Sequence, residues 1–230
     1  MIIVNAFFAA LGQMGDPRFR KVLYLGVGLT ILLLIAAYSG FLWLINWLVG
    51  EEATLPWIGE VAWLNDLVSW SSILLMMVLS VFLMVPVASA ITSMFLDEVA
   101  QAVEDRHYPA LPPVPGLPFL DALWDTLGFL GIIILANLLA LVLYAFFPPF
   151  APFIFWGMNG FLLGREYFTL AAMRRVGREG ARELRRRHMP TIWMAGTLMA
   201  IPLSIPLVNL LIPILGAATF THIYHAVSGR

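Results

Sequence analysis

Two long stretches of this chain carry no charged residue, and they restrict the folds that it can adopt. Val22 to Val49 and Leu67 to Leu96 are mainly apolar runs without Asp, Glu, Lys or Arg. The hydrocarbon core of a bilayer is about 30 Å thick and needs about 20 apolar residues as helix. Both runs exceed that length, and Pro86 predicts a kink in the second. We therefore predict two long transmembrane helices, over 22–49 and 67–96.

The composition of the whole chain agrees with a membrane environment. Of its 230 residues 61% are hydrophobic and 12% are charged, whereas soluble domains are about 45–50% apolar and about 25% charged. A soluble globule of this size could not bury so much apolar surface, which excludes an ordinary soluble enzyme. We expect an all-α integral membrane protein with one membrane domain, 1–230.

The apolar runs of the second half are shorter or interrupted. Phe150 to Leu163 has 14 residues before Arg165, about 21 Å of helix, which is less than the bilayer core. The last run, Thr191 to Thr221, is too short for two complete spans and contains three prolines. We predict helical hairpins over 120–172 and 191–221 that penetrate the bilayer only partway.

Lys and Arg are concentrated in three segments outside the apolar runs. Three cations precede the first run, Arg106 lies in the middle loop, and seven arginines fall within 174–187. Because cytoplasmic loops carry an excess of Lys and Arg, these segments are predicted to face the cytoplasm. The rest of the predicted organisation consists of an interfacial helix over 1–16, a cytoplasmic helix and loop over 97–118, and an Arg-rich cytoplasmic helix over 174–188.

No motif for catalysis, a metal or a cofactor is present in the sequence. The chain has no Cys, and its four His are never spaced as a metal pair on one apolar helix. No Ser-His-Asp, His-Glu-x-x-His or Gly-x-Ser-x-Gly arrangement and no ATP-binding loop occurs. We therefore expect no enzyme activity, no catalytic residue, no metal and no cofactor. The near balance of 13 Lys and Arg against 14 Asp and Glu, without aromatic residues among the arginines of 174–187, predicts no nucleic-acid partner.

Three cations lie at the start of the first predicted span: Arg18, Arg20 and Lys21. Asp16 is a favourable N-cap and Pro17 suits the first helical turn. Cations beside the free amide groups of a helix N-terminus can form an oxyanion site. The alternative is a topology anchor that contacts lipid phosphates.

A charged pair interrupts the short apolar run of the second half. Charges at membrane depth usually face a bundle interior or a water path, so Arg165 and Glu166, with Asn159, are candidates for a permeation path. Alternatively, Arg165 forms a structural ion pair or lies at the edge of the membrane. For Asn159 and Asn137 the alternative is a hydrogen bond between helices. Three glycines at helical spacing predict a close helix contact: Gly157, Gly160 and Gly164.

Two further charged segments favour structural explanations. The arginines of 174–187 predict a polybasic helix on anionic lipid. In the middle loop Glu104, Asp105 and His107 are close in sequence, but adjacent residues on a helix point apart. A solvated helix face is therefore predicted there rather than a metal site.

The run Asn159–Arg175 reads N-G-F-L-L-G-R-E-Y-F-T-L-A-A-M-R-R, and three other segments accompany it: Pro17–Lys21, Phe95–Pro109 and Pro206–Ala217. Together they resemble the CysZ sulfate-permease family, also called the etoposide-induced-protein domain family. The resemblance extends from about Phe7 to the end of the chain.

This resemblance implies a bacterial inner-membrane, multi-pass protein with two long transmembrane helices and partial hairpins, assembled as a homo-oligomer, a hexamer. It implies uptake of sulfate or a related oxyanion into the cytoplasm for cysteine synthesis, with membrane lipids as further partners. In the family, sulfate is bound near a Gly-Leu-Arg motif at the start of the first long helix. Arg20 matches the arginine of that motif, and Arg18 stands in place of the glycine.

Two other functions remain open at the level of the sequence. One is a membrane scaffold that binds or shapes lipid without transport, in which Lys should replace Arg18 and Arg20 freely because lipid attraction depends mainly on charge. The other is a membrane enzyme, which would need Glu104, Asp105 or His107.

Overall fold

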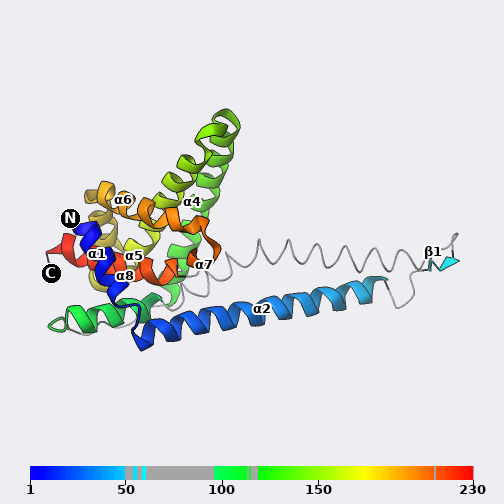
Figure 1. The fold of residues 1–230 in the computed structure, drawn as a ribbon, viewed down its shortest axis with the longest axis horizontal. Coiled ribbons are helices and arrows are strands. Elements are labelled where there is room, and N and C mark those ends of the chain that lie inside the picture. Colours follow the sequence, from blue (N-terminus) through cyan, green and yellow to red (C-terminus); the bar gives the residue numbers. More distant parts are fainter. Residues whose placement is uncertain are drawn as a thin grey trace. The chain divides into compact units, whose positions relative to one another are not determined.

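The computed structural model describes residues 1–49, 54–55, 59–60, 96–112, 114, 119–209 and 211–229. Helices account for nearly all of these described residues (Figure 1). Among these residues the only strands are β1 (Thr54–Leu55) and β2 (Gly59–Glu60), which form one short antiparallel pair. The predicted all-α class is confirmed. The chain divides into two compact units, one of Met1–Leu23 with Ser93–Arg230 and one of Tyr24–Thr92.

The first unit contains most of the described helices and the first turns of α2 (Pro17–Val49). A helical segment over 96–107, green in Figure 1, carries the acidic residues of the middle loop. The remaining elements are α1 (Ile2–Gly12), α4 (Phe119–Phe146), the 3-10 turn η1 (Pro148–Phe150), α5 (Ala151–Arg187), α6 (Met189–Ala200), the 3-10 turn η2 (Ile201–Ser204), α7 (Pro206–Asn209) and α8 (Ile212–Ser228).

Helix α8 forms the centre of this unit. Every residue from Ile212 to His225 is buried, as expected for a helix that is apolar on most of its circumference. Helices α1 and α5 both pack against it. The buried residues of α1 are Ala6 and Ala10, whose small side chains allow a close approach to α8.

Helices α5 and α6 touch through glycine, as the spacing of the glycines predicts. A Cβ built on Gly164 would lie 2.6 Å from the carbonyl oxygen of Ile192, and one on Gly160 would lie 2.6 Å from the amide of Thr197. Gly196 of α6 faces Gly160 in the same contact. A Cβ built on Gly157, in contrast, would meet nothing within 4 Å, so only Gly160 and Gly164 of the three predicted glycines are needed for this close approach.

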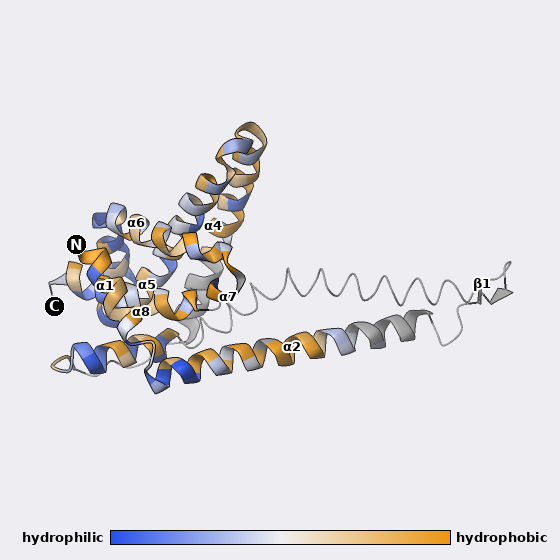
Figure 2. Ribbon diagram, in the orientation of Figure 1, coloured by the Kyte–Doolittle hydropathy of each residue, from blue (hydrophilic) through white to orange (hydrophobic). Residues whose placement is uncertain are grey.

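Helices α4 and α5 are joined at a proline turn. Helix α4 ends at Phe146, and Pro148 and Pro149 form η1 before α5 begins, because proline lacks the amide that would continue the helix. The apolar part of α4 over Gly131–Phe146 is shorter than a bilayer-spanning helix. It is orange over much of its length in Figure 2 and exposes several large apolar side chains, among them Leu135, Leu141 and Phe146.

Among the described residues, one helix is long and apolar enough to cross a membrane by length and composition, Pro17–Gly40 of α2. Its exposed side chains in the second unit include Leu25, Ile31, Leu32 and Ile35, which water would solvate poorly. The first predicted span therefore coincides with a helix of sufficient length. The second, 67–96, lies outside the described residues except for its last residue.

Candidate functional site

The start of α2 is fixed by a side-chain cap, as the sequence predicts. The amide of Arg18 donates a hydrogen bond of 2.9 Å to Oδ1 of Asp16. Gln13 donates from Nε2 to Oδ2 of Asp16 over 3.1 Å and to the carbonyl oxygen of Ala102 over 3.0 Å. These bonds tie the first turn of α2 to the segment 96–107. Because Asp16 occupies the Arg18 amide, an anion at this helix end has to be bound mainly by side chains.

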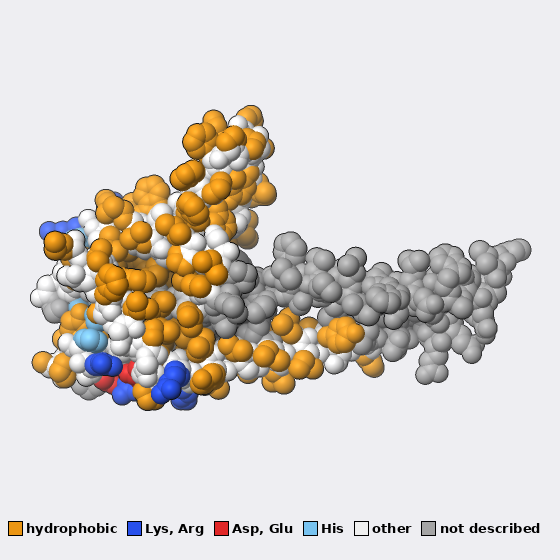
Figure 3. Space-filling view, viewed as in Figure 1, with side chains coloured by type: hydrophobic (Ala, Val, Ile, Leu, Met, Phe, Trp, Pro, Cys, Tyr) orange, Lys and Arg blue, Asp and Glu red, His pale blue; other side chains and the backbone are white. Residues whose placement is uncertain are grey.

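The cations of the predicted anion site lie next to acidic residues of the segment 96–107. Nη1 of Arg18 is 2.5 Å from Oδ2 of Asp105, and Nζ of Lys21 is 3.6 Å from Oε1 of Glu98. The side chains of Arg18 and Lys21 are 51% and 62% exposed, and Arg20 is exposed as well. The hydrogen bond from Arg18 lowers the pKa of Asp105. Arg18 and Lys21 are therefore paired but exposed cations. Figure 3 shows basic side chains (blue) next to acidic side chains (red) on the surface that it draws.

A second group of charges is buried and surrounds Glu104, whose side chain is 2% exposed. Arg175 makes a bidentate contact, with Nε 3.0 Å from Oε1 and Nη2 2.8 Å from Oε2 of Glu104. Nη2 of Arg174 lies 3.5 Å from Oε2, and Nε2 of His225 lies 3.1 Å from Oε1. We call Glu104, Arg174, Arg175 and His225 the buried ion cluster. It joins the segment 96–107 to α5 and α8.

Both arginines of the buried ion cluster have further partners. Arg174 donates to the carbonyl oxygen of Asp97 over 2.7 Å and to Oε1 of Gln101 over 2.6 Å, and its Nε is 3.2 Å from Oδ1 of Asp97. Arg175 donates from Nη1 to the carbonyl oxygen of Pro112 over 2.6 Å. Their side chains are 4% and 6% exposed. Such dense pairing is what a buried charge requires.

The surroundings of Glu104 keep it ionised. Burial alone would raise its pKa, but the hydrogen bonds from His225 and Arg175 and the charge of Arg174 outweigh burial and lower the pKa to about 2. At neutral pH the carboxylate is therefore an acceptor, and Nε2 of His225 donates to it. The buried ion cluster therefore contains an ionised carboxylate at neutral pH that is paired with both arginines.

Two predictions from the sequence are wrong at this place. Glu104 was predicted on a solvated helix face, and Arg174 on a polybasic helix against lipid. The structure buries both, because three basic side chains from α5 and α8 converge on one carboxylate. Asp105 and His107 are exposed as predicted. No group of three or more potential metal-ligating side chains was found among the described residues.

A histidine and a tyrosine lie beside the buried ion cluster. Oη of Tyr108 is 3.1 Å from Nδ1 of His222, and the Tyr108 ring packs on that of His225 with a centroid distance of 4.0 Å. Burial, with smaller contributions from His107 and His225, lowers the pKa of His222 to about 4. His222 is therefore neutral at physiological pH.

The residues of the predicted permeation path lie in the first half of α5. Arg165 is half-buried and its Cζ lies 5.8 Å from the centroid of the Phe129 ring of α4, within cation–π range. Glu166 is also half-buried. Asn159 donates to the carbonyl oxygen of Phe155 over 2.9 Å, and Asn137 to that of Ile133 over 2.8 Å. The expected interhelical bonds are thus replaced by bonds within each asparagine's own helix.

Helix α5 is interrupted at Gly177, which has φ 68° and ψ −176°. This conformation is essentially restricted to glycine. It separates Arg174 and Arg175 from the arginines further along α5, so that the predicted Arg-rich helix is not one continuous face. Beyond the break, Nη1 of Arg185 donates back to Oγ1 of Thr169 over 2.8 Å.

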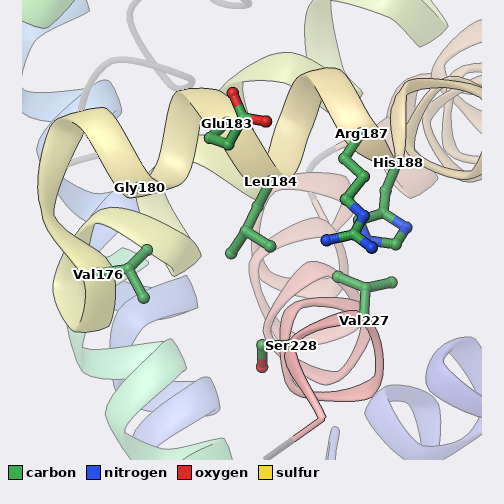
Figure 4. A pocket seen from close by; sticks show the side chains of 8 residues that line it. All are labelled: Val176, Gly180, Glu183, Leu184, Arg187, His188, Val227 and Ser228. Carbon is green, nitrogen blue, oxygen red and sulfur yellow. The ribbon is translucent and has the colours of Figure 1, made fainter.

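Two cavities open near the end of α5. The larger, about 470 Å³, lies between α5 and α8. Figure 4 shows Arg187 and His188 next to each other above Val227, while Glu183 lies apart from them. The smaller, about 200 Å³, is lined by Arg165, Arg185 and Arg186 together with apolar residues. Sequence reasoning did not bring these three arginines together, because they are separated by a glycine break and a long stretch of helix.

A signal for the buried ion cluster does exist in the sequence. Asp97, Gln101 and Glu104 are spaced by four and three residues and therefore share one helix face. The arginines that bind this face, Arg174 and Arg175, follow an apolar helix. A charge at that position needs a partner, and a polar stripe on another helix is the natural candidate.

These features define the class of the protein: an α-helical chain with one described helix of membrane-spanning length and charged groups that join the start of α2, the segment 96–107, α5 and α8. The chain matches the family model described as sulfate transporter CysZ/etoposide-induced protein 2.4 over residues 6–213. It therefore belongs to that family, as the four sequence segments predict. A comparison with curated proteins found no match.

Proposed function

We propose that this chain is an inner-membrane transporter or channel-like permease that brings sulfate, or a related oxyanion, into the cytoplasm for cysteine synthesis. The family match over 6–213 carries this proposal. Homo-oligomeric assembly, as a hexamer, and hairpins that penetrate the bilayer partway belong to the same proposal. We propose no enzymatic step, so the flux is passive or coupled to an ion.

Arg18, Arg20 and Lys21 are the proposed capture site for the anion. Arg18 and Lys21 are paired with Asp105 and Glu98, but these pairs are about half exposed. Exposed ion pairs contribute only about 0–1 kcal/mol. An oxyanion can therefore replace a carboxylate at small cost, which the buried ion cluster around Glu104 would not allow.

Arg guanidinium groups suit this role because their fork of N–H donors matches a tetrahedral oxyanion. Arg20 corresponds to the arginine of the family motif, and Arg18 adds a second guanidinium where the motif has glycine. Further along the route, Arg165, Glu166 and Asn159 on α5 are the proposed lining residues. Of these, Arg165 supplies a fixed positive charge that attracts an anion along the proposed route.

The experiment is radiolabelled sulfate uptake into proteoliposomes that contain the purified full-length protein, beside empty liposomes. The test variant is Arg18→Ala with Arg20→Ala, and the matched control is Arg182→Ala, an exposed arginine of α5. We expect uptake by the native protein and the control and a loss of at least tenfold in the double variant, with its assembly unchanged.

A Lys variant distinguishes transport from the lipid scaffold. Arg18→Lys with Arg20→Lys keeps the charge but removes the bidentate contacts, so sulfate uptake should fall several-fold. Uptake that survives the Ala substitutions would move the capture site away from α2. No uptake above empty liposomes, with either a membrane potential or a pH gradient, would overturn transport and favour the scaffold.

A further inference from the structure

The smaller cavity at the end of α5 gathers three guanidinium groups. Arg165, Arg185 and Arg186 line a space of about 200 Å³ together with apolar side chains of α5 and α6. Arg165 comes from the apolar half of α5 and the other two from beyond the break at Gly177. The fold therefore assembles this cavity from parts of the helix that are distant in sequence.

Two of the three arginines are held in place by neighbouring residues. Arg185 donates from Nη1 to Oγ1 of Thr169 over 2.8 Å. The guanidinium of Arg165 lies over the Phe129 ring at 5.8 Å. Arg186 is exposed and lines the same space. A pair of positioned guanidinium groups with a third, exposed one is a favourable arrangement for a tetrahedral oxyanion.

The other walls of the cavity are apolar and come from α5 and the start of α6. Met189 and Trp193 are 46% and 47% exposed, although both are large apolar side chains. The Trp193 ring is fixed by a hydrogen bond of 2.8 Å from Nε1 to the carbonyl oxygen of Gly157. Tryptophan is enriched at the level of lipid headgroups, where its ring faces acyl chains and its N–H group faces polar groups.

We propose that this cavity binds a tetrahedral oxyanion, and that its apolar wall selects the phosphate of an anionic membrane lipid over a free ion. The three arginines bind the phosphate oxygens, while Met189 and Trp193 contact the beginning of an acyl chain. Basic pockets between membrane helices on the cytoplasmic side bind lipid headgroups in this way. The proposal goes beyond sulfate transport, because it adds Arg185 and Arg186 to Arg165 of the proposed permeation path and does not require flux.

The test is isothermal titration calorimetry on the full-length protein in a neutral detergent. The probes are short-chain phosphatidylglycerol, short-chain phosphatidylcholine, inorganic phosphate and sulfate. Each is titrated into the native protein and into Arg185→Lys, Arg186→Lys and Arg182→Lys. These substitutions keep the net charge, so that only a built guanidinium site responds. Melting temperatures confirm that the variants fold.

We expect phosphatidylglycerol to bind at least tenfold more tightly than phosphatidylcholine. Arg185→Lys and Arg186→Lys should each weaken it about fivefold, and Arg182→Lys less than twofold. If phosphate or sulfate alone bind as tightly and with the same dependence on Arg185 and Arg186, the oxyanion site stands and its preference for lipid is overturned. Equal effects at all three positions, or no binding of any anion, would overturn the site itself. The titrations measure binding and not sulfate flux. A negative result would therefore overturn the lipid site without overturning the transport proposal.

Discussion

The arginines before and after Gly177 in α5 differ in what surrounds them. Arg174 and Arg175 are almost fully buried and share one carboxylate, that of Glu104. Arg185 and Arg186 line an open cavity beside exposed apolar side chains. A run of arginines in the sequence is therefore not one functional surface. A buried guanidinium needs a dedicated counter-ion and serves the fold, whereas an accessible one can bind an anion from outside.

The largest effect should come from removal of the shared carboxylate. Glu104→Ala leaves Arg174 and Arg175 buried without their counter-ion and Nε2 of His225 without its hydrogen-bond acceptor. Breaking a buried ion pair costs about 3–5 kcal/mol in the free energy of unfolding. The measurement is chemical or thermal unfolding of the purified protein in detergent. Glu98→Ala on the same helical segment is the control, with a loss below about 1 kcal/mol. Similar losses in the two variants would show that the buried ion cluster contributes no more than a surface pair.

The second prediction concerns the break that separates the two groups of arginines. Gly177→Ala should destabilise the protein by about 1–3 kcal/mol, because φ of 68° with ψ near 180° is strained for any residue with a Cβ. Gly157→Ala is the matched control in α5, since its Cβ would meet nothing within 4 Å. It should be neutral or stabilising by up to about 1 kcal/mol. A Gly177→Ala variant as stable as the control would mean that α5 runs through without this break.

Local features of the fold could be predicted from the sequence, and long-range pairings could not. Helical class, the Asp16 cap and a close helix contact at Gly160 and Gly164 follow from neighbouring residues and helical spacing, but the partner helix α6 does not. Glu104 contacts residues 70 to 121 positions away, so its hydrogen-bond partners depend on how the helices pack. The mistaken solvated face came from judging the segment 96–107 alone, without the cationic residues that must pair with it.

The third prediction concerns acid stability and His222. The folded pKa of His222 is about 4, below its ordinary 6.5, so the unfolded chain binds more protons in this interval. The free energy of unfolding should therefore fall as the pH decreases from about 6.5 to about 4. Thermal unfolding at several pH values should show a weaker decrease for His222→Asn. Glu104 affects the free energy of unfolding at lower pH, because its pKa is lowered from 4.5 to about 2 in the folded protein. An unchanged slope between pH 6.5 and 4 in the variant would contradict this assignment.

The smallest effect is expected at the exposed pair of the proposed capture site. Asp105→Asn should change the free energy of unfolding by less than about 1 kcal/mol, because both partners are about half exposed. The same substitution removes the carboxylate that competes for Arg18. Sulfate should then bind at least as tightly as in the native protein, measured by titration of the purified protein at low ionic strength. If Asp105→Asn lowered the free energy of unfolding by more than about 2 kcal/mol, the Arg18–Asp105 pair would stabilise the fold as strongly as a buried ion pair.

The most direct measurement is a pair of double-mutant cycles on the free energy of unfolding, one for Glu104 with Arg175 and one for Asp105 with Arg18. Residues in direct contact couple by about 0.5–3 kcal/mol, and burial should set where in that range each pair falls. We predict a coupling above about 1.5 kcal/mol for Glu104 with Arg175 and below about 0.5 kcal/mol for Asp105 with Arg18. Equal couplings, or a larger one at the exposed pair, would contradict the division of the basic residues into those that hold the fold and those that can bind an anion.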